Sequence, residues 1–455
     1  MSAIIAAAED DPSQSQPLDS RQLKRRFALT LLAGKWERVA LIERTEITFG
    51  DSLTWIALFV DRLLAQFGEA QPPPFRRVLA FVRDDEGFEK ARTRHKLKIV
   101  QTVFSPTAMA AKPGPPATWI VPKLVTEADQ CAWFETSPEQ LAWLADVHGR
   151  ERTRSGRLRQ YLYKWVRKRS GGMRLLEIPK SKLKSMQRRI LKDILGCIPA
   201  HPAACGFVQN GSVLRFVLPH SGKRFVLRMD LKDFFTSVQI SRVHALFRTV
   251  GYSENIARVL AGLCTNSVPP DVLAIPEWSD PSAALHKQKM RTPHLPQGAP
   301  TSPALANLCA YKLDVRLSAL AKRFDWAYTR YADDLLFSGR KGGRAFMAQF
   351  QIWAGAIAIE ESFELNMRKT RFMPPGARQH AAGLVLNEKP NISRDDFDAL
   401  KAILHNCVKL GPASQNREQH ANFRAHLLGR ISYVAQIHPQ RGMRLHKMFE
   451  AINWA

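Results

Sequence analysis

The sequence predicts an α+β protein with a mainly helical N-terminal extension, and two patterns support this fold class. Apolar residues recur at three- and four-residue steps between Leu53 and Phe67, which is the period of a helix. Further along, residues 161–178, 224–232 and 326–339 contain short runs that alternate or concentrate β-branched and aromatic residues, as strands do. With 455 residues, 45% of them hydrophobic, the chain can form two or three domains with sizeable cores.

Net charge indicates the kind of partner. The chain has 67 Lys and Arg against 41 Asp and Glu, a net charge of +26, and this surplus favours a polyanion, with nucleic acid as the first candidate. An anionic membrane is the alternative, but no apolar run approaches the roughly 20 residues of a spanning helix. The polar and acidic start of the chain is unlike a signal peptide. We therefore expect a cytoplasmic protein that binds nucleic acid and no membrane.

Composition predicts how the first part of the chain is divided. Residues 1–20 are polar and rich in Pro and Ser, which predicts a disordered tail. Residues 21–105 form the helical extension, whose second half is basic, and residues 106–122 form a Pro-rich linker. We expect a domain boundary in this linker.

Helices and a hairpin are predicted beyond the linker. Residues 126–144 predict two short helices, and Ser137 is expected to cap the second. Two strand-like runs at 161–166 and 173–178 flank a glycine-containing turn and predict a basic β-hairpin. Near the C-terminus, helical spacing recurs over two further stretches, 400–408 and 423–448.

The first candidate catalytic residue is Asp230, near the end of the strand predicted within residues 224–235. A carboxylate in this position is held by a rigid scaffold and faces solvent. Taken alone it indicates little, because an Asp at the end of a strand is more often a turn former.

Asp333 and Asp334 are the second candidate, at the turn of a tight hairpin predicted over residues 326–339. Adjacent carboxylates repel each other unless a cation or a basic side chain compensates. A solvated Asp-Asp turn is the simpler explanation for an isolated pair, but the apolar residues on both sides suggest a buried hairpin, where two charges are costly. Together with Asp230, the pair could hold two divalent ions for phosphoryl transfer, because such ions prefer oxygen ligands.

Residues 294–303, which lie between these segments, predict an irregular loop that leads into a helix. Ser302 and Pro303 look like the N-cap and first residue of a helix that runs to Leu320. The start of that helix, together with Gln297, would face a nucleotide. A stiff loop that only begins a helix is the simpler explanation for this segment in isolation.

Taken together, the three segments resemble motifs A, B and C of the reverse transcriptase family, in the order that the family requires. The resemblance extends from about residue 161 to the C-terminus. It implies a right-hand polymerase with fingers and palm in residues 123–378, a ferredoxin-like palm sheet, and a primer grip and helical thumb in residues 379–455. It also implies an RNA-directed DNA polymerase in which Asp230, Asp333 and Asp334 are the catalytic and metal-binding residues for two Mg²⁺ ions, with Mn²⁺ as a substitute.

The resemblance implies further site residues. The nucleotide-binding group consists of Lys168, Arg174, Asp233, Phe235, Gln297 and Lys369. In this group the first two match finger residues that grip the triphosphate, Phe235 matches a bulky gate against a ribose 2′-hydroxyl, and Lys369 matches a motif D lysine that aids departure of pyrophosphate. Ordinary surface charge and, for Phe235, a core position are the alternatives. Near the primer, the resemblance implies roles for Tyr331, Gly383 and Asn387.

Within the family, the likeness is to the bacterial retron group, which copies part of a structured non-coding RNA into a small DNA, called msDNA, and often serves in anti-phage defence. The implied partners are that RNA template, the RNA–DNA duplex, dNTPs and a retron effector protein. Two motifs depart from the group. Retron enzymes typically carry Asn-Ala-x-x-His where this chain has Phe216 to His220, and Val-Thr-Gly where it has Ala381 to Gly383. Because these elements are associated with retron RNA handling, the cognate RNA and priming group are not predicted.

Several alternatives stay open. Another domesticated or defence-associated reverse transcriptase would share the motifs, an RNA-dependent RNA polymerase would share the metal site, and a non-catalytic RNA-binding scaffold would share the shape. Residues 21–100 are expected to dock the RNA or an effector protein, or to stabilise the fingers as a helical cap.

Overall fold

The computed structural model describes residues 19–50, 54–101, 119–167, 172–274 and 281–454. The chain forms two compact units, residues 1–109 and 110–455, which are described separately. Most of the expected tail and linker lies outside the described residues, as does Lys168. In the part of the chain that is described, no helix combines the length and apolar character needed to cross a membrane.

The first unit is helical, as predicted. Its helices are α1 (Ser20–Leu31), α2 (Arg38–Phe49), α3 (Thr54–Phe67), α4 (Phe75–Asp84) and α5 (Glu86–His95). Aromatic rings fill the core between them. The ring of Phe27 lies 5.0 Å from the rings of Phe49 and Phe88 and 5.3 Å from that of Phe59, measured between centroids, and all four side chains are buried. Contacts of this kind let about eighty residues form an independent core.

The second unit begins with the two predicted short helices and the predicted hairpin. These are α6 (Glu127–Phe134), α7 (Pro138–Leu144), the antiparallel strands β1 (Tyr161–Arg167) and β2 (Met173–Pro179), and then α8 (Ser181–Asp193). Ser137 caps α7 as expected, because its hydroxyl accepts a hydrogen bond from the Gln140 backbone nitrogen at 3.3 Å.

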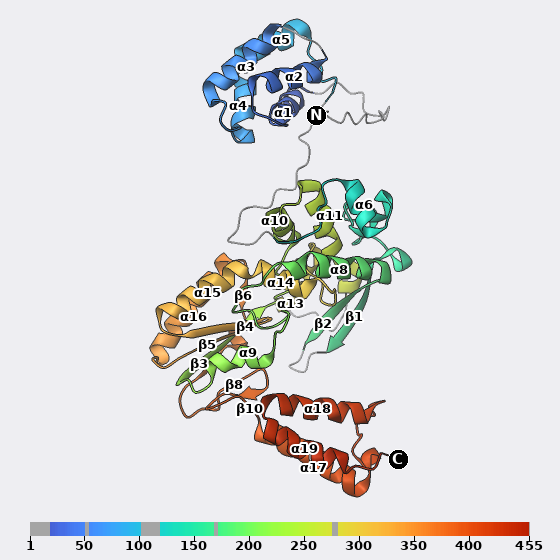
Figure 1. The fold of residues 1–455 in the computed structure, drawn as a ribbon, viewed down its shortest axis with the longest axis vertical. Coiled ribbons are helices and arrows are strands. Elements are labelled where there is room, and N and C mark those ends of the chain that lie inside the picture. The colour runs from blue at the N-terminus through green and yellow to red at the C-terminus, as the bar shows by residue number, and fades with distance from the viewer. Residues whose placement is uncertain (1–18, 51–53, 102–118, 168–171, 275–280, 455) are drawn as a thin grey trace. The chain divides into compact units, whose positions relative to one another are not determined.

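An antiparallel sheet forms the centre of the second unit (Figure 1). Its strands are β3 (Phe225–Lys232), β4 (Ala327–Tyr331), β5 (Asp334–Gly339), β6 (Glu364–Leu365) and β7 (Arg371–Met373). The order is β4-β5-β3-β6, and β7 also pairs with β3. Mixed helices and antiparallel strands confirm the predicted α+β class.

Helices cover this sheet and extend away from it. They are α9 (Val213–Val217), α10 (Ile240–Val250), α11 (Glu254–Cys264), α12 (Pro270–Leu273), α13 (Pro281–Arg291), α14 (Ser302–Cys309), α15 (Tyr311–Arg323) and α16 (Arg344–Glu360). Helices α15 and α16 lie along one face of the sheet (Figure 1), where the rings of Phe337 and Phe350 are 5.1 Å apart. On the other face, Phe216 and Val217 pack with Leu336.

The C-terminal part consists of a small sheet and three helices. The sheet contains β8 (His380–Ala381), β9 (Leu384–Val385) and β10 (Asn391–Ile392), and the helices are α17 (Arg394–Leu410), α18 (Phe423–Ile437) and α19 (Pro439–Glu450). Buried residues from these helices join the core on the Phe216 face of the central sheet.

Three details of the helix predictions are wrong. Ser302 is the first residue of α14 and Thr301 precedes it as the cap residue; the Ser302 hydroxyl donates instead to the Pro296 carbonyl at 2.7 Å. The helix expected to run to Leu320 divides at Ala310 into α14 and α15. The stretch expected over 423–448 divides at His438, immediately before Pro439, because proline has no N–H to continue a helix and disfavours helical backbone in the residue before it.

Candidate active site

The three predicted carboxylates come together at one end of the central sheet. Asp230 and Asp334 are directly paired across β3 and β5, and residues paired in this way point to the same face. Asp333 lies in the two-residue turn between β4 and β5, and its backbone oxygen accepts a hydrogen bond from Leu231 N at 2.8 Å. Burial, together with the charges of Asp230 and Asp334, raises the pKa of Asp333. Negative charge is therefore concentrated at this edge.

A buried arginine supports the turn that presents Asp333. Ala332 has a φ of 56°, a left-handed conformation that costs roughly 1–2 kcal/mol in a residue other than glycine. Arg330, which is fully buried, donates from Nη1 to the Ala332 carbonyl at 3.0 Å and to Asn307 Oδ1 at 2.8 Å. These bonds hold the carbonyl of the strained residue in place and so stabilise the turn.

Two basic side chains compensate two of the three carboxylates. Arg228 donates to Asp334 Oδ1 from Nη2 at 2.8 Å and from Nε at 3.0 Å, and Lys369 Nζ donates to Asp230 Oδ2 at 2.9 Å. Arg228 is not among the predicted site residues, although its place two residues before Asp230 puts both side chains on one face of β3.

The ion pairs of Arg228 and Lys369 also affect how the carboxylates could bind a metal ion. With the side chains so placed, no group of three His, Cys, Asp or Glu residues within the described ranges is arranged to hold a metal ion. Three carboxylates at one edge nevertheless have the donor chemistry of a magnesium or manganese site. Asp230 and Asp334 would have to exchange their basic partners for the cation.

Two of the three carboxylates, Asp230 and Asp333, border a cavity of about 1040 Å³, which is large enough for a nucleotide. Besides Asp230 and Asp333, the predicted nucleotide-binding residues that line it are Arg174, Asp233, Phe235, Gln297 and Lys369. Among the described residues predicted to contact the primer, Tyr331, Gly383 and Asn387 do not line this cavity. The structure therefore brings the residues predicted for catalysis and nucleotide binding together, whereas the residues predicted to contact the primer are not among those that line the cavity.

A buried polar joint connects the β1–β2 hairpin to the loop that carries Gln297. The Glu177 backbone nitrogen donates to the Gln297 carbonyl at 2.8 Å, and Glu177 Oε1 lies 3.1 Å from His294 Nε2. Glu177 and His294 are fully buried. Gly298 has a φ of 134°, and a Cβ there would lie 2.8 Å from the Glu177 carbonyl. Glycine is therefore required at this position for the close approach.

Asp233 pairs with His286, a histidine that the sequence motifs do not indicate. Its φ is 54°, and its Oδ1 lies 2.6 Å from Nδ1 of His286 on α13. Burial by itself raises the pKa of Asp233, but the hydrogen bond and charge of His286, together with the charges of Lys289 and Lys232, outweigh burial and lower it. No local pattern links these two residues, because they come from separate elements.

Phe207 also lines the cavity, although the sequence motifs assign it no role. Its φ is 60° and its side chain is 45% exposed, an unusual combination for a bulky residue that often marks a functional position. Its ring lies 6.1 Å from that of Phe235 and 6.4 Å from that of Tyr331. The preceding Gly206 fits closely against the Ala332-Asp333 turn, since a Cβ at this position would lie 3.1 Å from the Ala332 nitrogen.

The predicted primer-grip residues lie in the small C-terminal sheet. Gly383 has a φ of 80° in the turn between β8 and β9. Asn387 accepts a hydrogen bond from Gln379 N at 3.1 Å and donates one to Ala377 O at 2.8 Å. These bonds give Asn387 a structural role in its own loop, and contact of either residue with a primer stays a prediction.

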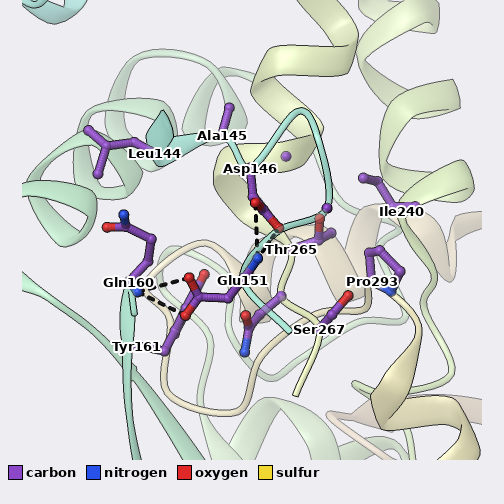
Figure 2. Close-up of a pocket in the computed structure, with 13 residues that line it drawn as sticks. Leu144, Ala145, Asp146, Glu151, Gln160, Tyr161, Ile240, Thr265, Ser267 and Pro293 are labelled. Carbon is purple, nitrogen blue, oxygen red and sulfur yellow. Dashed lines mark hydrogen bonds between the residues drawn. The ribbon is translucent and has the colours of Figure 1, made fainter. Parts of the chain in front are cut away.

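A second, much smaller cavity lies away from the carboxylates (Figure 2). Its volume is about 50 Å³, so it has room for water molecules only. Glu151 is the central polar residue, and its carboxylate accepts the Gln160 backbone N–H at 2.8 and 3.0 Å. This cavity is therefore part of the internal packing near the start of β1 and is no substrate site.

Comparison with known proteins agrees with this geometry. Residues 166–392 match a family model described as "Reverse transcriptase (RNA-dependent DNA polymerase)". Two Myxococcus xanthus proteins are similar to this chain. Retron Mx65 reverse transcriptase is 39% identical over 64% of this chain and 64% of its own length. Retron Mx162 reverse transcriptase is 36% identical over 61% of this chain and 58% of its own length. Retron Ec86 reverse transcriptase from Escherichia coli is 30% identical over 60% of this chain and 74% of its own length. The matches therefore span less than two thirds of either Myxococcus relative.

Proposed function

Because this chain belongs to the reverse transcriptase family, we propose that it is an RNA-directed DNA polymerase. The observation that carries the proposal is the convergence of Asp230, Asp333 and Asp334 beside a cavity large enough for a nucleotide. These carboxylates come from two separate segments of the chain, and a solvated Asp-Asp turn would not require the third.

Residues around the cavity suit the parts of a deoxynucleoside triphosphate. Arg174 on β2 offers a cation to the phosphates, which arginine binds well. Phe235 and the neighbouring Phe207 offer apolar rings to the sugar and base, and Phe235 would exclude a 2′-hydroxyl by its bulk. Gln297 provides an amide for a further hydrogen bond to the nucleotide.

We assign Asp230, Asp333 and Asp334 as the ligands of two divalent ions, Mg²⁺ or in its place Mn²⁺. Such ions, when bound, would activate the primer 3′ oxygen and neutralise the charge of the leaving pyrophosphate. The chain itself holds the carboxylates together and compensates them with Arg228 and Lys369. Lys369 also lines the cavity, so after leaving Asp230 it could interact with the departing phosphates.

The finer proposal is that the chain is a retron-type enzyme, which copies a structured non-coding RNA into msDNA as part of anti-phage defence. It is supported by the names of the relatives, which are retron reverse transcriptases. The net charge of +26 suits binding to RNA and to the RNA–DNA duplex. The first unit, whose described helices lie between Ser20 and His95, is then the candidate docking part for that RNA or for an effector protein.

The test is primer extension on a primed RNA template, with dNTPs or NTPs supplied separately. The expected result is extension with dNTPs and Mg²⁺, and its loss in the double variant Asp333→Asn/Asp334→Asn with the affinity for RNA largely unchanged. Extension only with NTPs would instead identify an RNA polymerase. A wild-type chain that binds RNA without extending any primer would identify a non-catalytic scaffold.

A further inference from the structure

His220 is a fully buried histidine that bridges the two strands of the catalytic hairpin. Its Nδ1 lies 2.7 Å from Ser338 Oγ on β5, and its Nε2 lies 2.8 Å from Thr329 Oγ1 on β4. The side chain has no exposed surface. It comes from a short 3-10 helix, Leu218–His220, that directly follows α9. His220 is the one residue kept from the motif that in retron enzymes is associated with RNA handling.

The hydrogen bonds around His220 have one consistent direction. The Thr329 hydroxyl donates to the Phe216 carbonyl at 2.7 Å, so its oxygen accepts from His220 Nε2–H. Nδ1 then carries no proton and accepts from the Ser338 hydroxyl. Burial lowers the pKa of His220 to about 3, which agrees with a neutral ring that has both nitrogens satisfied. These hydrogen bonds allow the ring only one orientation. Because the ring binds Thr329 and Ser338, it also fixes the positions of these residues on β4 and β5 relative to each other.

The two strands that His220 joins are those that end and begin at the catalytic turn. Thr329 lies two residues before Tyr331 on β4, and Ser338 lies four residues after Asp334 on β5. By strand alternation, these four side chains share one face of the sheet. On this face, Leu336 and Tyr331 pack against the core that contains Phe216 and Val217.

We propose that His220 is a positioning residue that fixes the β4–β5 hairpin, and through it Asp333 and Asp334, relative to the α9 segment. This inference rests on the proposed polymerase function. It assigns His220 a role inside the protein, where RNA has no access to it. The Phe216 position, where retron enzymes typically carry Asn, likewise lies in the core.

Thr329 offers the sharpest test, because Val has nearly the same shape and no hydroxyl. In the full-length chain, Thr329→Val removes both the acceptor for His220 Nε2–H and the donor to the Phe216 carbonyl. It should therefore lower kcat for DNA synthesis by at least about tenfold, with the KM for dNTP and the Kd for primed RNA changed less than about twofold. Thr329→Ser keeps the hydroxyl and should keep most of kcat. His220→Gln and His220→Asn each retain one of the two ring-nitrogen contacts and should lie between wild type and His220→Ala.

Hydrogen–deuterium exchange provides a readout independent of activity. Thr329→Val should speed exchange in peptides covering residues 327–339 and leave the helices of residues 20–95 unchanged. Leu218 is 55% exposed on the same 3-10 helix, so Leu218→Ser is the matched control for contact with RNA. Unchanged exchange in residues 327–339 would overturn the inference, and so would a weaker Kd for RNA shared by Thr329→Val and Leu218→Ser with kcat retained. If the wild type makes no DNA, the proposed function fails, while the exchange experiment still tests His220.

Discussion

Arg330 and Asp314 form a fully buried ion pair next to the Ala332-Asp333 turn. Arg330 Nε lies 2.8 Å from Asp314 Oδ1 and Nη2 lies 2.6 Å from Oδ2, so the contact is bidentate. The Tyr328 hydroxyl donates to the same Oδ1 at 2.8 Å. The pair joins α15 to β4 at the point where Arg330 also holds the Ala332 carbonyl.

Removing one partner of this pair should be strongly destabilising. Asp314→Asn leaves the buried guanidinium uncompensated, and we expect the free energy of unfolding in urea to fall by about 3–5 kcal/mol. The double variant Asp314→Leu/Arg330→Met removes both charges and should recover part of that loss, yet DNA synthesis should stay low because the Ala332 carbonyl loses its donor. A double variant less stable than the single one would contradict this account.

The Glu177–His294 pair should make stability depend on pH. Burial alone would lower the pKa of His294, but the Glu177 carboxylate outweighs burial and raises it above the ordinary 6.5. Protonated His294 donates from Nδ1 to the Thr292 carbonyl and from Nε2 to Glu177. Because the folded pKa is raised, this stabilisation is complete below about pH 6.5 and is lost as pH rises through the folded value.

The measurement is the difference in free energy of unfolding between wild type and His294→Gln at several pH values, in which the other titrating groups largely cancel. The difference should be largest in acid and should shrink as pH increases. A difference that does not vary with pH would show that His294 is neutral in the folded protein.

Lys369 should compete with divalent cations for Asp230. Because the Lys369 side chain is half exposed, its ion pair with Asp230 should contribute no more free energy than a surface ion pair. In the absence of nucleotide, we therefore expect Mn²⁺ to bind Lys369→Met about two- to fivefold more tightly than it binds the wild type. Titration calorimetry would measure this affinity. Arg316→Met is the matched control, because Arg316 pairs with Glu360 and Glu361 elsewhere. Equal Mn²⁺ affinity of wild type and Lys369→Met would exclude competition at Asp230.

Phe235 should determine the preference for deoxynucleotides. Phe235→Ala opens space beside Phe207, and we expect the ratio of kcat/KM for NTP to that for dNTP to rise at least about tenfold, which corresponds to roughly 1.4 kcal/mol of lost discrimination. Phe372→Ala is the control, because that ring stacks on Phe225 in the sheet. An unchanged ratio in Phe235→Ala would mean that discrimination resides in other residues.

Local patterns predicted much of the fold. Strand alternation placed Asp230 near the end of β3, and the apolar runs around Asp333 and Asp334 predicted the β4–β5 hairpin, because these elements depend on side-chain periods of two residues. The break at Pro439 could also have been predicted, since a proline within a helical pattern ends the preceding helix.

Contacts between distant segments were beyond the reach of local patterns. Glu177 and His294 are 117 residues apart in sequence, and Arg228 and Asp334 are 106 apart. Nothing in the neighbourhood of either residue indicates its partner, because each pair forms only after the sheet and the helices have assembled. The same holds for His220, whose partners Ser338 and Thr329 are 118 and 109 residues away in sequence.

The hydrogen bond from Glu177 N to Gln297 O couples the β1–β2 hairpin to the loop that carries Gln297. Arg174 and Gln297 line the same cavity, and the strand and the loop that carry them are connected by this hydrogen bond, so a shift of one is expected to displace the other. The position of the phosphate-binding Arg174 and that of the nucleoside-binding Gln297 would then be coupled. A ligand that has only a phosphate or only a nucleoside would bind to a site whose geometry fits a molecule with both.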